Sequence, residues 1–221
     1  MIPLRDTIPS ATVPVVTRAL IAANVLTFLY QVGLGPSDEA FVRTYGLVPR
    51  HVHLQDLATL QPFLTSMFLH GGWMHLLGNM LYLHIFGDNV EDRLGHVRFL
   101  ALYLLGGLIA GMAQVAFNPH SGVPMVGASG AIAGVTGAYF LFFPHARIVT
   151  LVPIFIFIQI VELPAVFFLL VWFGFQLLLG FGSLGAHGAA GGVAFWAHVG
   201  GFLAGMALGP VLATRGRAVA L

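Results

Sequence analysis

Six apolar stretches, each close to the length that crosses a lipid bilayer, constrain this chain more than any other feature of its sequence. A membrane-spanning helix needs about 17–25 predominantly apolar residues. Only 8% of the 221 residues are charged, whereas soluble domains have about 25%, so lipid must be the main solvent. We therefore expect an all-α membrane protein, a bundle of six transmembrane helices. The six stretches cover residues 15–33, 73–90, 97–117, 128–144, 163–182 and 192–213.

The distribution of arginine predicts how this bundle is oriented. The chain has no lysine, and cytoplasmic loops of membrane proteins are enriched in basic residues. If both termini are cytoplasmic, Arg43 and Arg50 lie outside and the other seven arginines lie inside: Arg5, Arg18, Arg93, Arg98, Arg147, Arg215 and Arg217. We predict a cytoplasmic N-terminus (1–14), a membrane domain (15–214) and a cytoplasmic C-terminal tail (215–221). The lack of lysine and the many Ala, Gly and Arg residues favour a prokaryotic cytoplasmic membrane.

Two connections are predicted to lie at the membrane surface. Residues 34–72 mix apolar, aromatic and polar side chains, which is typical of an interfacial loop, here between the first and second helices. Residues 151–162 are apolar but are followed closely by Pro164, so we expect an interfacial segment or loop, or else an extension of the fifth helix. The first stretch could be a signal peptide, but no small-residue cleavage site follows it.

Composition also excludes several kinds of site. The chain has no cysteine, which excludes disulfides, thiolate metal ligands and a cysteine nucleophile. The net charge is +1 and no basic run occurs, so nothing points to a nucleic-acid partner.

Polar side chains inside the apolar stretches are the candidate functional residues, because a polar group in the bilayer is costly unless it has a partner or a task. His75 and Asn79 are four residues apart and share one helix face. Ser129 begins the fourth stretch, and His198 lies in the sixth. Small residues would let these last two helices approach closely within lipid; they are Gly130, Gly134, Gly201 and Gly205.

Close approach of these helices would bring a serine near a histidine. A neutral imidazole such as that of His198 can take the proton of a serine hydroxyl and make it a nucleophile. Ser129 would lie at a helix N-terminus, where free backbone N–H groups favour a developing oxyanion. His75 and Asn79 could donate hydrogen bonds to the same anion. Since no Asp or Glu lies within these spans near the pair, we infer a Ser–His dyad.

Three ordered motifs give the sequence a resemblance to the rhomboid intramembrane proteases. They are HGGWMHLLGNMLYLHIFGDNVEDRLG (70–95), GASGAIAG (127–134) and AHVGGFLAG (197–205). The resemblance covers about residues 15–214. It implies a six-helix rhomboid-like bundle whose active site opens to the extracytoplasmic side.

The resemblance also implies a role for each residue that matches a motif. Ser129 matches the nucleophile, His198 matches the base, and His75 and Asn79 match the oxyanion hole, together with the backbone N–H of Ser129. The implied substrates are single-span membrane proteins within the lipid bilayer, cut in or near the transmembrane segment without cofactor or metal. Some members stack an aromatic residue on the histidine from the position of Ala133, which leaves open what orients His198 here.

Other polar and aromatic residues are interpreted as structural. Glu91, Asp92 and Arg93 are expected to form an ion cluster that ends the second helix at the cytoplasmic surface, and His84 is turned away from the site. The tryptophans, Trp172 among them, are most simply packing or membrane-interface residues. The glycine-rich stretch 180–192 is either a gate beside His198 or an ordinary flexible connection.

Other functions fit the sequence less well. A metalloprotease would need H-E-x-x-H on a helix, which is absent. An aspartyl protease would need two intramembrane aspartates, and Asp88 has no partner in another span. A transporter should show a polar pathway and broken helices. A rhomboid-like protein that only binds or routes membrane clients would be expected to lack Ser129 or His198, and both are present.

Overall fold

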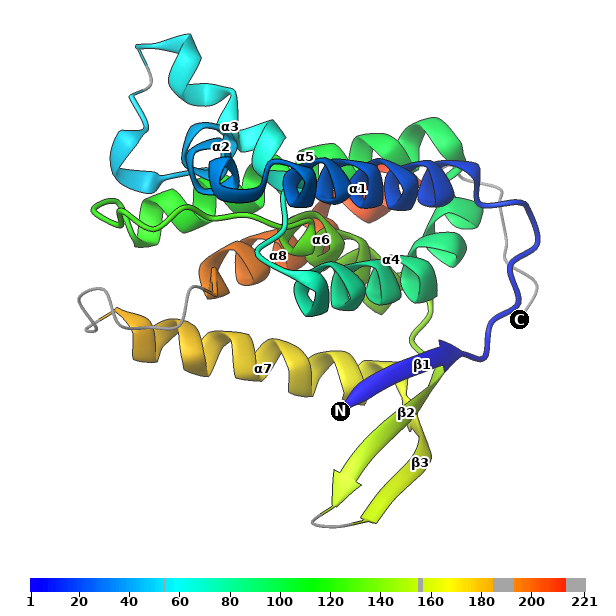
Figure 1. The fold of residues 1–221 in the computed structure, drawn as a ribbon. Helices are drawn as coiled ribbons and strands as arrows, with labels where there is room; N and C mark the ends of the chain where they lie inside the picture. The colour runs from blue at the N-terminus through cyan, green and yellow to red at the C-terminus, as the bar shows by residue number, and fades with distance from the viewer. Residues whose placement is uncertain (54, 155–156, 185–192, 214–221) are drawn as a thin grey trace.

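The computed structural model describes residues 1–53, 55–154, 157–184 and 193–213, and this part of the chain is mostly helical. Six long helices occupy the six apolar stretches (Figure 1): α1 Val15–Gly33, α4 Trp73–Leu94, α5 His96–Phe117, α6 Ser129–Phe142, α7 Ala165–Ser183 and α8 Phe195–Leu212. By length and hydropathy, four of the described helices could each cross a membrane, namely α1, α5, α7 and α8. The chain is therefore a multi-pass membrane protein. That α4 and the shorter α6 also cross the bilayer stays a prediction.

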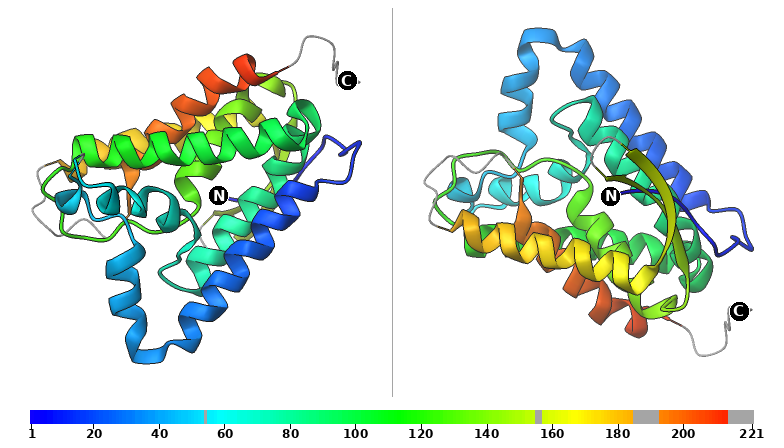
Figure 2. Two further views of the ribbon diagram at one scale, coloured as in Figure 1. Left: turned by 90° about the horizontal axis from the view of Figure 1, so that it is seen from above. Right: turned by 90° about the horizontal axis from the view of Figure 1, so that it is seen from below.

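Helix α6 forms the centre of the bundle and packs against α4, α5 and α8 (Figures 1 and 2). Every residue from 130 to 139 in this helix is buried. On α8, a Cβ atom added to Gly201 would overlap the backbone carbonyl of Gly130, and one added to Gly205 would overlap that of Gly134. The two helices therefore touch backbone to backbone, in the way that small residues permit within lipid.

A three-stranded antiparallel sheet lies beyond the end of α6, where an all-α fold was expected. The order is β1 (Ile2–Asp6), β2 (Arg147–Ile154) and β3 (Phe157–Pro164). Arg147 pairs with Pro164 at the open end of the β2–β3 hairpin, which projects away from the helices (Figure 1). The described residues of this stretch, 151–154 and 157–162, are thus strand, and both interpretations of them as loop or helix were wrong. Residues 147–163 are rich in Val and Ile, which favour strands, and Pro164 precedes the first turn of α7.

The connection between α1 and α4 is built from short helical pieces (Figure 1). They are η1 Gly35–Ser37, α2 Asp38–Tyr45, η2 Pro49–His51, η3 Leu57–Leu60, α3 Pro62–Thr65 and η4 Ser66–Phe68. The Thr65 hydroxyl donates a hydrogen bond to the backbone carbonyl of Tyr45, which ties α3 to α2. That the connection between α1 and α4 lies at the membrane interface stays a prediction.

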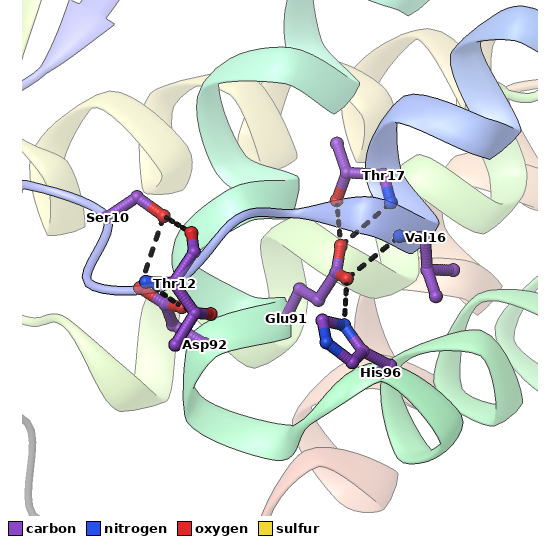
Figure 3. Close-up of polar contacts among 7 residues, drawn as sticks. All are labelled: Ser10, Thr12, Val16, Thr17, Glu91, Asp92 and His96. Carbon is purple, nitrogen blue, oxygen red and sulfur yellow. Dashed lines mark hydrogen bonds and ion pairs between the residues drawn. The ribbon is translucent and has the colours of Figure 1, made fainter.

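The carboxyl end of α4 holds the start of α1 in place. Glu91 is buried and accepts hydrogen bonds from the backbone N–H groups of Val16 (2.9 Å) and Thr17 (2.7 Å), from the Thr17 hydroxyl, and from His96 Nδ1 (Figure 3). The donors of Val16 and Thr17 lie at the N-terminus of α1, where backbone N–H groups lack helical partners and the helix dipole favours an anion, whereas His96 begins α5.

Asp92 binds the segment just before α1. It accepts hydrogen bonds from the backbone N–H of Thr12 (2.9 Å) and from the hydroxyls of Ser10 and Thr12 (Figure 3). Glu91 and Asp92 therefore cap backbone groups, and do not form only the ion cluster that was expected.

Candidate active site

Ser129 is the first residue of α6, so its backbone N–H is among those without an intrahelical partner. The chain turns into this helix at Gly127, whose φ of +121° strongly favours glycine. The Gly127 N–H donates to the Ser66 carbonyl at 2.9 Å, which holds the turn against the segment before α4. Ser129 itself stays partly exposed.

His198 lies in the first turns of α8, opposite Ser129. Its Nε2 atom is 2.8 Å from Ser129 Oγ, which is hydrogen-bonding distance. The backbone contact of α8 with Gly130, one residue beyond Ser129, sets this separation. The structure thus brings together the hydroxyl and the imidazole that the sequence analysis paired.

His75 and Asn79 project from α4 toward the same turn. A Cβ atom added to Gly127 would lie 2.6 Å from His75 Nε2 and 3.4 Å from Asn79 Nδ2, so both nitrogens face the backbone two residues before Ser129. The Gly71 N–H donates to His75 Nδ1 at 3.3 Å, which leaves the hydrogen of a neutral ring on Nε2. Asn79 Nδ2 is buried and has no hydrogen-bond partner among the described residues. Two donors therefore face this turn.

Helix α7 adds two residues that the sequence analysis did not place in the site. Gln176 Oε1 lies 2.8 Å from His198 Nδ1, and the Trp172 ring lies 5.9 Å from the imidazole. The interpretation of Trp172 as a packing or interface residue missed this contact. Gln176 interrupts an apolar helix, and this polar residue was the signal that could have found it.

No other histidine of the described residues is hydrogen-bonded to Ser129 or His198. His84 is exposed, as are His51 and His53 in the connection after α1. His70 is buried and packs edge-on against His75, and burial, followed by the nearby His75, lowers the pKa of His70 to about 4. No three His, Cys, Asp or Glu side chains of the described residues cluster in a way that could hold a metal ion. Most of the possible gate at 180–192 lies outside the described residues.

Comparison with known proteins identifies a family. A family model described as the Rhomboid domain matches residues 58–215. The chain is 34% identical over 126 residues to Rhomboid protease GluP of Bacillus subtilis, an alignment covering 57% of this chain and 24% of that protein. It is 28% identical over 196 residues to Rhomboid protein 1, mitochondrial, of Saccharomyces cerevisiae, covering 86% of this chain and 51% of that protein.

A plant relative, RHOMBOID-like protein 5 of Arabidopsis thaliana, is 33% identical over 105 residues, which cover 48% of this chain and 33% of that protein. The alignments therefore span no more than about half the length of these relatives. The matched region contains α4 to α8, and thus Ser129, His198, His75 and Asn79. On this evidence, the chain belongs to the rhomboid family.

Proposed function

We propose that this chain is an intramembrane serine endopeptidase that cuts transmembrane proteins in or near their membrane-spanning segment. The observation that carries the proposal is the 2.8 Å contact between Ser129 Oγ and His198 Nε2. Membership of the rhomboid family supports the same reaction class. The family alone does not decide the matter, because a fold also hosts members without catalysis.

The proposed reaction is acyl transfer. His198 takes the hydroxyl proton as Ser129 attacks the scissile carbonyl, and the imidazolium then gives this proton to the leaving amine. Water attacks the acyl-enzyme in a second step, again with His198 as base, and the imidazolium returns the proton to Ser129 Oγ as the product acid leaves. The oxyanion of each tetrahedral intermediate accepts hydrogen bonds from the Ser129 N–H, His75 Nε2 and Asn79 Nδ2.

The hydrogen bonding of Asn79 and His75 in the structure supports this assignment. The Asn79 amide leaves a buried donor unused, and such a group costs stability unless a ligand or intermediate pairs with it. The hydrogen bond from Gly71 to His75 Nδ1 fixes Nε2 as the donor, as an oxyanion site requires. Both nitrogens are thus prepared for an anion that forms only during the reaction.

The proposed setting is a prokaryotic cytoplasmic membrane, with six spans and both termini cytoplasmic. Ser129 begins α6 and His75 lies in the first turn of α4, at the end of the bundle away from the sheet, which in this topology faces the outside. The proposed substrates are single-span proteins. A substrate helix must unwind before attack, because its backbone groups are all hydrogen-bonded within lipid. No cofactor or metal is part of the proposal.

Cleavage of a reference transmembrane substrate in detergent tests the proposal. The wild type should cut it, whereas Ser129→Ala and His198→Ala should lower kcat by about 10³-fold or more. A fluorophosphonate should label Ser129 in the wild type and fail to label the Ser129→Ala variant. Wild-type activity in either variant, or a covalent adduct on another residue, would overturn the dyad. A folded wild type that neither cleaves nor labels would favour a client-binding role.

A further inference from the structure

His198 can act as the base only in one of its two neutral tautomers. A neutral imidazole carries one hydrogen, and the nitrogen that receives the serine proton must be free of it. Because Nε2 faces Ser129 Oγ, the hydrogen must be on Nδ1. A hydrogen-bond acceptor beside Nδ1 would select this tautomer and also fix the rotation of the ring, as acceptors do for metal-bound histidines.

Gln176 places an acceptor at this position. It lies on α7, its side chain is buried, and its Oε1 atom is 2.8 Å from His198 Nδ1. An amide oxygen only accepts hydrogen bonds, so this contact requires a hydrogen on Nδ1.

The orientation of the Gln176 amide is set by a second contact. Its Nε2 group donates to the backbone carbonyl of Trp172, one turn earlier in α7, at 3.4 Å. If the amide were flipped, its oxygen would face that carbonyl oxygen, and its NH₂ group would donate to His198 Nδ1. A flipped amide would therefore lose a hydrogen bond and select the wrong tautomer.

The same face of α7 also restricts the imidazole ring. Trp172 and Gln176 are four residues apart and so share a helix face, and the Trp172 ring lies 5.9 Å from the His198 ring at an interplanar angle of 38°. Ala133, where some family members carry an aromatic residue, is buried and has only a methyl side chain. In this chain the aromatic ring beside His198 therefore comes from Trp172 on α7 and not from position 133.

We infer that Gln176 is a positioning residue, which holds His198 in the tautomer and orientation needed to take the proton of Ser129, with Trp172 restricting the ring. The inference rests on the proposed function. A neutral amide suits this location, since a carboxylate at the same depth would be costly in lipid unless it were paired with a charged imidazolium. The Gln176 amide thus takes the place of the third member of a triad as an uncharged hydrogen-bond acceptor.

The test compares labelling and cleavage in variants of the full chain. Gln176→Met keeps the length of the side chain and removes the acceptor, Gln176→Glu keeps an acceptor, and Leu178→Met changes an exposed residue of the same helix as a control. The first readout is the rate at which a small fluorophosphonate labels Ser129, which needs the base but no docking of a transmembrane substrate. The second is the separation of kcat from KM for a transmembrane substrate.

Gln176→Met should lower the labelling rate and kcat roughly 10- to 100-fold, with KM nearly unchanged. Gln176→Glu should keep most of the activity, and Leu178→Met should match the wild type. In a His198→Ala background, Gln176→Met should cause no further loss, because Gln176 acts only through the His198 ring. Gln176→Asn, whose side chain is one methylene shorter, provides a second variant if Gln176→Met does not fold.

The outcomes separate the inference from the proposed function. Wild-type labelling by Gln176→Met, or a loss confined to KM, would overturn the positioning role and leave the dyad in place. Equal losses in Gln176→Met and Gln176→Glu would also overturn it, because the role requires an acceptor. A wild type that does not label at Ser129 would overturn both.

Discussion

Two buried polar residues toward opposite ends of helix α4, Glu91 and Asn79, differ in their hydrogen bonding. At the carboxyl end, buried Glu91 accepts hydrogen bonds from two backbone N–H groups, a hydroxyl and His96. Near the amino end, Asn79 leaves a buried donor without a partner among the described residues, and His75 directs its Nε2 atom toward the turn before Ser129. Buried polar groups in folded proteins are normally paired, so an unpaired one calls for a reason. The comparison indicates that Glu91 stabilises the fold, whereas the proposed function gives Asn79 and His75 an anion that forms only during the reaction.

Removal of Glu91 should have the largest effect and should act on stability alone. Glu91→Ala leaves the N–H groups of Val16 and Thr17 without their acceptor and should lower the free energy of unfolding by about 3 kcal/mol. Denaturation in mixed detergent measures this change, and kcat per folded molecule should stay the same. Glu162→Ala is the control, because Glu162 is half exposed and its contact with Arg147 is 3.7 Å; its effect should stay below about 1 kcal/mol. Equal effects of the two variants would contradict the capping role.

Removal of Asn79 should lower activity and leave stability intact, in contrast to removal of Glu91. Asn79→Ala should lower kcat by roughly 10²-fold, equivalent to about 2.7 kcal/mol of lost oxyanion stabilisation. The free energy of unfolding should hold or rise, because the variant no longer buries an unpaired donor. Kinetics on a transmembrane substrate and the same denaturation assay give both numbers. A stable, fully active variant would make Asn79 a packing residue.

Lowering the pH should reduce the free energy of unfolding through His70, which lies just before α4. Burial lowers its pKa to about 4 from an ordinary value of 6.5, so between these pH values the unfolded chain binds a proton that the folded chain does not. The stabilisation present above pH 6.5 should thus be lost as the pH falls toward 4, at up to about 1.4 kcal/mol per pH unit. His70→Phe should show a shallower loss over this range, and identical slopes in the two proteins would refute the assignment. His75, which is in edge-on contact with His70, is present in both the wild type and the His70→Phe variant.

The smallest effect is expected at Asp92. Asp92→Asn keeps an acceptor for the Thr12 N–H at a partly exposed position, so the free energy of unfolding should change by less than about 1 kcal/mol. The denaturation assay used for Glu91 would detect it. A loss as large as that of Glu91→Ala would mean that the segment before α1 contributes as much to stability as the cap on α1 itself.

The positions of the six long helices could be predicted because a bilayer sets the length of an apolar helix. The first stretch, 15–33, has the same bounds as α1, and the other five differ by a few residues. The contact between α6 and α8 also followed from local sequence, since small residues at matching spacing permit backbone contact. Ser129 and His198 were found together because each stands out as a polar group beside such a stripe.

The sheet and Gln176 were missed for different physical reasons. Strand β1 pairs with β2 although the whole of α1 to α6 lies between them in sequence, and no local pattern encodes so distant a partner. Exposed apolar residues of β3, such as Phe157 and Ile158, are adjacent in sequence and so hide the alternation typical of strands. Gln176 did carry a local signal, but its role depends on a contact with another helix.

The long-range pairing of β1 has a consequence for biosynthesis. Strand β1 (Ile2–Asp6) leaves the ribosome long before its partner strand β2 (Arg147–Ile154), which follows only after α6 has been made. At about 5–20 residues per second, this strand waits on the order of ten seconds for its neighbour. The cap on α1 is delayed in the same way, because Glu91 emerges with the end of α4. Strand β1 and the N-terminus of α1 therefore reach their partners only late in synthesis. The sheet can form only after four of the six long helices have been synthesised.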